Sequence, residues 1–224
     1  MPGIADNALV KASRYIECLG SLTVTPRLLP ETEAFFAALG EVPLAEELRG
    51  RLAALEPGVR GMVEPMLGIS VSPTMIEASR KRNVIPAVCE VVCDCRLLPG
   101  QPQREAEQVV RACLGDAPDY EIEWIEGVGG TSSPPTGPLW KAVGSFVAEE
   151  DPGAALAPVV LPGFTDSHFV REAFGTVAYG FFPMKTMDPE LAARLIHSAD
   201  ERVAVADLEL GTRFLVHVAR TLEA

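Results

Sequence analysis

Three histidines are the first residues whose chemistry could include metal binding or proton transfer, and His197 has the most suggestive surroundings. It follows a predicted helical stretch, Pro189–Ile196, and is itself followed by Asp200 and Glu201. An imidazole at the end of an element, beside carboxylates that can orient its second nitrogen, suits a metal ligand. The local sequence leaves two interpretations open: a metal ligand, or a histidine without a chemical role.

The other two histidines have weaker indications. His168 lies just after Asp166 in a turn that starts with glycine, where a side chain can face a cleft; it is either a substrate contact or structural. His217 lies inside the last predicted helix beside Phe214, and we expect a surface or hydrogen-bonded histidine there.

A charged pair and a cysteine cluster share one predicted strand, Ala87–Leu97. Asp94 and Arg96 face the same side of this strand. They form either a surface ion pair or an arginine fork for a substrate carboxylate. The opposite face carries three cysteines, which are Cys89, Cys93 and Cys95. Reduced cysteine packs as a small hydrophobe, so core packing is the preferred interpretation and a thiolate or redox role the alternative.

The composition excludes several classes of protein. A net charge of −12 provides no basic excess to release counterions, so we expect neither nucleic acid nor an anionic membrane as partner. No apolar run approaches the roughly 18–20 residues of a membrane span, and the first residues do not resemble a signal peptide, so we expect a cytoplasmic protein. Five cysteines, an odd number, argue against a disulfide framework. The sequence has no Gly-rich phosphate loop, nucleophile elbow or His-Glu-x-x-His helix.

The elements that must position these residues fall into two groups. Residues 1–126 predict a helix from Asp6 as N-cap through Leu19, strands Ile69–Ser79 and Ala87–Leu97, a helix Ala106–Leu114 and a strand Tyr120–Trp124. Two amphipathic stretches, Glu31–Leu39 and Leu44–Leu55, form a predicted helical insertion at about 22–66. This order lacks only an initial strand to be the βαββαβ unit of a ferredoxin-like layer.

A Gly/Ser/Thr/Pro-rich stretch, 127–137, predicts the junction to a second domain, residues 127–224. The elements expected there are a helix around Leu139–Val147, a strand Leu156–Leu161, a short helix to Phe174, a strand Thr176–Phe182 and a closing helix around Leu208–Leu222. Alternating helices and strands indicate an α/β layer.

Four segments along the chain carry a more specific signal. They are the opening Pro2–Ala8, then Asn83–Ala87 with Asp94–Gln101, then Gly163–Asp166, and finally Tyr179–Pro183 with His197–Val203. Together they resemble the co-catalytic zinc hydrolases that include aminoacylases, carboxypeptidases, dipeptidases and amino-acid deacylases. The resemblance implies an α+β fold: a ferredoxin-like lid or dimerisation layer without its first strand, followed by the C-terminal part of an α/β zinc-peptidase catalytic domain.

The resemblance also implies a chemistry and roles for residues. In the family, two zinc ions bridge a water that attacks an amide carbonyl, and a glutamate is the general base. By this resemblance His197 would ligate one zinc ion, while Asn83 and Arg96 would bind the free carboxylate of a small-molecule or peptide substrate, often from the lid of a partner subunit in a homodimer. The residues that would form the pocket wall are Gly163, Thr165 and Asp166.

The departures from the family pattern are as informative as the matches. The family's His-x-Asp motif, bridging aspartate and Glu-Glu pair lie N-terminal to the lid, and this chain begins after that position. One histidine cannot hold two zinc ions, which take about four ligands each. Phe164 also replaces the second glycine of the family's turn. We therefore expect no catalytic residue here, and two hypotheses stay open: a fragment of an amide-bond hydrolase acting on N-acyl amino acids or small peptides, or a non-catalytic dimerisation or binding module.

Overall fold

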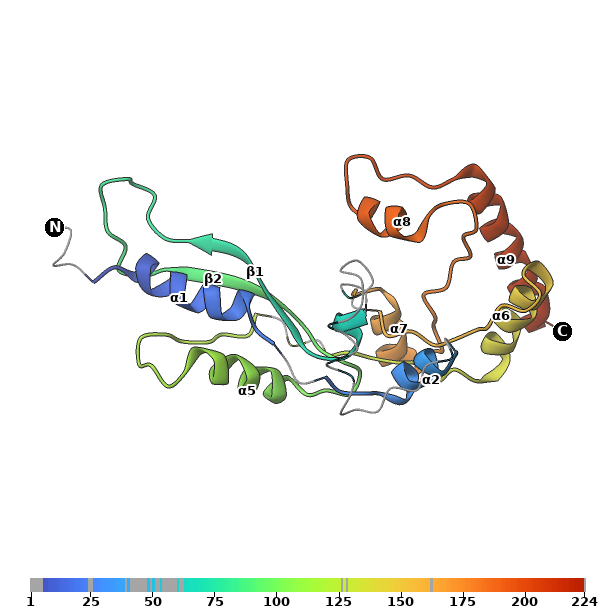
Figure 1. The fold of residues 1–224 in the computed structure, drawn as a ribbon, viewed down its shortest axis with the longest axis horizontal. Helices are drawn as coiled ribbons and strands as arrows, with labels where there is room; N and C mark the ends of the chain where they lie inside the picture. Colours follow the sequence, from blue (N-terminus) through green and yellow to red (C-terminus); the bar gives the residue numbers. More distant parts are fainter. Residues whose placement is uncertain are drawn as a thin grey trace.

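The structure is a computed structural model that describes residues 6–23, 26–38, 40, 48, 50, 53, 60, 63–125, 127, 129–161 and 163–223. Its elements are α1 (Ala8–Gly20), α2 (Pro30–Ala38), the 3-10 helix η1 (Glu64–Met66), β1 (Ser70–Glu77), β2 (Glu90–Arg96), α5 (Gln103–Leu114), α6 (Gly137–Glu150), α7 (Ser167–Phe174), α8 (Pro189–Leu195) and α9 (Val205–Glu223). The molecule is elongated, with α1, β1, β2 and α5 at one end and α6 and α9 at the other (Figure 1). This mixed α/β architecture confirms the predicted fold class.

The sheet consists of β1 and β2, paired antiparallel from Ser70 opposite Arg96 to Glu77 opposite Glu90. The register shifts between Pro73 and Met75. A proline inside a strand has no N–H for the ladder, which accounts for an irregularity at this point. The predicted helix–strand–strand–helix order of the N-terminal part is confirmed by α1, β1, β2 and α5.

Helix α1 begins one residue later than predicted. Its N-cap is Asn7, whose side-chain oxygen accepts a hydrogen bond from the backbone N–H of Leu9 at 3.1 Å. The predicted cap, Asp6, instead forms an ion pair with Lys11 at 2.6 Å. Both residue types cap helices well, so the sequence alone could not choose between these neighbours.

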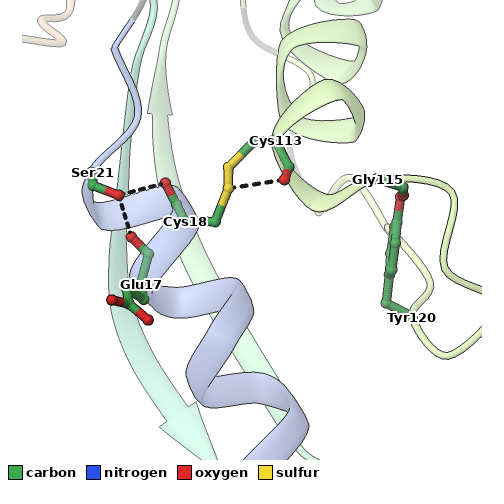
Figure 2. The surroundings of a disulfide bond; sticks show 6 residues. All are labelled: Glu17, Cys18, Ser21, Cys113, Gly115 and Tyr120. Atoms are coloured by element: carbon green, nitrogen blue, oxygen red, sulfur yellow. Dashed lines mark hydrogen bonds between the residues drawn. A yellow bond between two sulfur atoms is a disulfide. The ribbon is translucent and has the colours of Figure 1, made fainter.

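A disulfide joins α1 to α5 through Cys18 and Cys113, which are 95 residues apart in sequence (Figure 2). The prediction that the cysteines form no disulfide is wrong for this pair. An odd number of cysteines excludes only complete pairing; it says nothing about two that helix packing brings together.

The C-terminal part is organised around α6 and α9, which pack against each other. Their shared core contains Val143, Phe146, Leu210 and Phe214. At the start of α9, the buried carboxylate of Asp207 accepts hydrogen bonds from three consecutive backbone N–H groups, 2.8–2.9 Å away. These bonds fix the loop that precedes α8 against the helix pair.

Three predicted strands are wrong: Tyr120–Trp124, Leu156–Leu161 and Thr176–Phe182 belong to no strand. A strand exists only when a neighbour completes its ladder of hydrogen bonds, and none of these segments has such a partner among the described residues. The predicted helix Leu44–Leu55 lies largely outside the described residues.

Large apolar side chains remain exposed on the C-terminal segments that fail to form strands and on α9. They include Val159, Leu161, Val177, Phe182, Leu208 and Leu215. Exposed apolar surface of large extent is typical of protein interaction sites and ligand-binding grooves. No described helix combines the length and the apolar character needed to cross a bilayer.

Candidate substrate and metal site

A cleft of about 1820 Å³ runs between the hairpin of β1 and β2 and the segments around α7. Three of the predicted substrate-binding residues line it, namely Arg96, Gly163 and Thr165. Asn83, Asp166 and His197 do not line it. Three of the six predicted site residues thus line one cleft, from segments about 70 positions apart in sequence.

Arg96 is the last residue of β2 and enters the cleft beside Asp94. Its Nε donates to the Asp94 carboxylate at 2.7 Å, and the two side chains are 40% and 45% exposed. The terminal guanidinium nitrogens have no hydrogen-bond partner in the described part of the chain. The surface ion pair predicted from the sequence is thus present, and it leaves donors of Arg96 free to meet a carboxylate.

Asn83 lies in the exposed connection between β1 and β2, at the opposite end of the hairpin from Arg96. The six residues Glu90–Cys95 of β2 lie between the two positions and extend over roughly 20 Å at about 3.3 Å per residue. Within one chain the two side chains cannot grip the same carboxylate.

The turn that precedes α7 contains the other predicted wall residues. The carbonyl oxygen of Thr165 accepts a hydrogen bond from the N–H of His168 at 3.0 Å, so the turn leads directly into the helix. Asp166 occupies the N-cap position without a side-chain capping bond, which leaves its exposed carboxylate available. Phe164 packs against the rings of His168 and Phe169, with centroids 5.2 and 5.5 Å away. The Phe164 ring also lines the cleft.

His197 follows α8 and is exposed, with a backbone φ of +62°. Non-glycine residues seldom adopt this left-handed conformation, and the exceptions cluster at functional sites. The His197 N–H donates to the Glu201 carboxylate at 3.1 Å. No group of three or more His, Cys, Asp or Glu residues suited to a metal ion occurs in the described ranges. The described residues therefore do not form a two-zinc centre by themselves.

The remaining histidines differ in how their polar atoms are satisfied. His217 Nε2 lies 2.8 Å from Ser145 Oγ and its ring packs on Phe146, as expected for a hydrogen-bonded histidine. The buried Nδ1 of His168 has no hydrogen-bond partner among the described residues, and the side chain lines the cleft. Trp124 Nε1 shares both properties. Sequence reasoning missed Trp124, because an alternating pattern identifies a half-buried residue but not a donor left without a partner.

The cysteines of β2 are half-buried rather than part of a core. Burial raises the pKa of the Cys93 thiol, and burial, Asp94 and Cys93 raise the pKa of Cys95 to about 11. Both are therefore protonated at neutral pH, and a protonated thiol is a poor nucleophile and metal ligand. The raised pKa values disfavour the thiolate alternative, while the half-burial of both residues differs from the core packing expected from the sequence.

Arg171 on α7 was not singled out from the sequence, yet it has the densest polar contacts of the cleft. Its guanidinium donates to Ser133 Oγ at 2.9 Å, to the carbonyl and hydroxyl oxygens of Thr131 at 3.3 and 3.1 Å, and to the Ala178 carbonyl at 2.5 Å. Burial lowers the pKa of Arg171. The residue ties three segments together beneath the cleft. A lone arginine in a helical pattern gives no sequence signal for this role.

The chain is similar to known proteins of one family. Residues 1–120 match the family model of the peptidase dimerisation domain of M20 peptidases. Aminoacylase-1 from Sus scrofa is 29% identical over 146 residues, which are 63% of this chain and 34% of that protein. A metallo-carboxypeptidase of the M20 family from Sulfolobus solfataricus has the same fold, with a TM-score of 0.59 at 12% identity over 97% of this chain and 53% of that one.

The chain belongs to the M20 peptidase dimerisation domain family, because the match covers more than half of its residues. The family expected from the four sequence segments is thereby confirmed, and with it an origin among metal-dependent hydrolases. The chain spans about a third of the length of the aminoacylase and about half of the solved carboxypeptidase.

Proposed function

We propose that this chain is the lid and C-terminal portion of a metal-dependent hydrolase that cleaves amide or peptide bonds of N-acyl amino acids or small peptides. The boundary lies near residue 126, with the lid in 1–126 and part of the catalytic domain in 127–224. The observation that carries the proposal is the cleft lined by Arg96, Gly163 and Thr165, in a chain of this family. In this assignment Arg96 binds the free carboxylate of the substrate.

The same assignment makes Gly163, Thr165 and Asp166 the wall of the pocket and His197 the ligand of one metal ion, which we take to be zinc. His197 supplies one ligand only, so the other ligands and the general base come from a preceding catalytic segment. The exposed apolar side chains of α9 and of the extended segments support this incompleteness, since a complete α/β layer buries both faces of its strands. The chain alone therefore does not hydrolyse its substrate.

The position of Asn83 supports a homodimer through the lid. Asn83 precedes β2 and Arg96 ends it, so in this proposal a carboxylate that both contact receives one of them from a second copy. A dimerisation domain provides the means to place that copy.

The decisive experiment compares the purified 224-residue chain with a longer polypeptide that includes the sequence encoded directly upstream. We expect zinc-dependent release of amino acids from N-acetyl amino acids by the longer polypeptide and none by the chain alone. In the longer polypeptide, Arg96→Ala should raise KM about tenfold, the loss of one charge-assisted contact, with little change in kcat. Arg111→Ala is the matched control, because Arg111 also forms an ion pair along its own element but lies outside the cleft.

Each other outcome has a defined meaning. Zinc-dependent hydrolysis by the 224-residue chain alone would refute the incomplete-site proposal. An inactive longer polypeptide, or an upstream sequence without a His-x-Asp motif and a Glu-Glu pair, would favour the second candidate, a non-catalytic dimerisation or binding module. The family match to a dimerisation domain is the observation that favours that candidate.

A further inference from the structure

The disulfide between Cys18 and Cys113 is the covalent link between the two helices of the N-terminal part (Figure 2). The Cα atoms of the two residues are 6.1 Å apart, within the range of unstrained disulfides. Neither residue belongs to the cleft or to the predicted metal site. The bond therefore has to be explained by what it does to α1 and α5.

The apolar contacts between these helices are few. α1 buries Ala12 and Leu19, and α5 buries Ala106. None of the three apolar core clusters of the described residues contains a side chain from either helix. The other ties run from α1 to the segment just beyond α5. The Tyr15 hydroxyl donates to Asp119 at 2.5 Å, Lys11 pairs with the same carboxylate at 3.4 Å, and the Tyr15 ring packs on Tyr120 with centroids 5.3 Å apart. A covalent bond is thus a large share of what holds α5 to α1.

The helices matter because the sheet they accompany has two strands. A two-stranded hairpin is marginally stable in water unless further strands or a helix pack on it. α1 packs against both β1 and α5, so a loosened α5 also weakens the support of β1. Release of α5 from α1 would therefore weaken the support of the hairpin of β1 and β2.

We propose that Cys18 and Cys113 form a reversible redox lock on the N-terminal part: the disulfide holds α5 on α1, and its reduction releases α5. This inference does not depend on the hydrolase assignment. Both side chains are half-buried, so a small thiol or disulfide can reach the sulfur atoms. Accessible disulfides are the labile and regulatory ones, whereas permanent structural bonds resist glutathione.

The reaction balances with a low-molecular-weight disulfide such as oxidised glutathione as the oxidant. The thiolate of one cysteine attacks a glutathione sulfur, which forms a mixed disulfide and releases one glutathione thiolate. The thiolate of the second cysteine then attacks the protein sulfur, closes the Cys18–Cys113 bond and releases the second glutathione. The two protons of the cysteine thiols end on the two glutathione molecules. Reduction is the reverse sequence.

The reduced pair also has a defined place in the fold. The Cys18 sulfur lies 2.9 Å from the carbonyl oxygen of Cys113, so the Cys18 thiol can donate to this carbonyl when the disulfide is open. This weak bond keeps the two cysteines in register for re-oxidation without holding α5 firmly.

The test uses the complete chain equilibrated in glutathione buffers of graded redox ratio, followed by alkylation and peptide mass spectrometry. We expect Cys18–Cys113 to open and close reversibly in millimolar glutathione. Reduction should lower Tm by roughly 10 °C, the effect of opening a loop of this length in a chain of this size. Amide hydrogen exchange should increase in α1 and α5 and stay unchanged in α6 and α9.

Two variants separate this lock from a general effect of thiols. The variant Cys18→Ser/Cys113→Ser should show the reduced exchange pattern at every redox ratio. The variant Cys89→Ser/Cys93→Ser/Cys95→Ser, which keeps the pair, should respond as the unmodified chain does. Three outcomes would each overturn the proposal: the bond resists reduction by glutathione, the cysteines pair differently, or reduction leaves local hydrogen exchange unchanged. The first two are measured on the unmodified chain.

Discussion

Gly130, in the junction between the two parts of the chain, packs against the backbone that follows β2. A Cβ atom at Gly130 would lie 2.8 Å from the carbonyl oxygen of Leu97 and 2.9 Å from the carbonyl atoms of Leu98. Residue 130 also forms a bridge with Pro99, and its carbonyl accepts from the N–H of Gly100 at 3.3 Å. The atoms in the way are all backbone, so no side-chain rotation can relieve the contact.

The cost of Gly130→Ala follows from these distances. Nonbonded carbon atoms pack at about 3.5–4.0 Å, so the backbone near Leu98 must retreat by about half an ångström or more. Leu98 is 2% exposed and packs with Leu29, Met66 and Val160, so its displacement also disturbs a core. Overpacking of this kind costs about 1–3 kcal/mol, which predicts a Tm lower by about 2–12 °C in a chain of this length.

The matched control is the neighbouring substitution Gly129→Ala, because a Cβ there meets nothing within 4 Å. Both substitutions restrict the unfolded chain to a similar degree, so the difference between the variants isolates the native-state clash. Thermal unfolding by circular dichroism and urea midpoints are the measurements. Equal stability of the two variants would refute the close approach at Gly130.

Two further predictions concern the C-terminal part. Arg171→Lys should lower the free energy of unfolding by about 2 kcal/mol in urea titrations, because one ammonium cannot replace a guanidinium bonded to Thr131, Ser133 and Ala178. A change no larger than that of the exposed control Arg111→Lys would contradict this role. Backbone N–H groups, chiefly of Lys185 and Thr186, lower the pKa of Asp207. The unfolded carboxyl therefore takes up its proton first, and the stabilisation is complete above about pH 4 and lost as the pH falls through the lowered native value. Asp207→Asn should flatten this acid-side decline in the urea midpoint, and a decline as steep as in the unmodified chain would exclude Asp207 as its source.

The helices were predictable because their signals are local. In α5 the apolar residues from Ala106 to Leu114 recur at helical spacing, and Gly115, with a φ of +75°, ends the helix. The hairpin was predictable for the same reason, since the turn residues between β1 and β2 and the Pro-Gly after β2 punctuate two apolar stretches.

The failures share a cause, which is dependence on partners distant in sequence. Leu156–Leu161 and Thr176–Phe182 have the composition of buried strands, but a ladder needs a neighbouring strand that the described chain does not supply. The disulfide depends on α1 and α5 lying side by side, which no count of cysteines encodes. Arg96 and Thr165 line one cleft because of tertiary packing, which local sequence signals do not encode.

The carboxylate near His197 contacts the backbone of this residue in the structure. The sequence suggested that neighbouring carboxylates orient the imidazole, as they do around many metal ligands. In the fold, the Glu201 carboxylate binds the backbone N–H of His197 instead of its ring. That bond helps to hold a left-handed φ of +62°, a conformation that costs an L-residue about 1–2 kcal/mol. Glu201 therefore influences the direction of the imidazole through the backbone of His197. Any metal site that includes His197 needs further ligands from elsewhere.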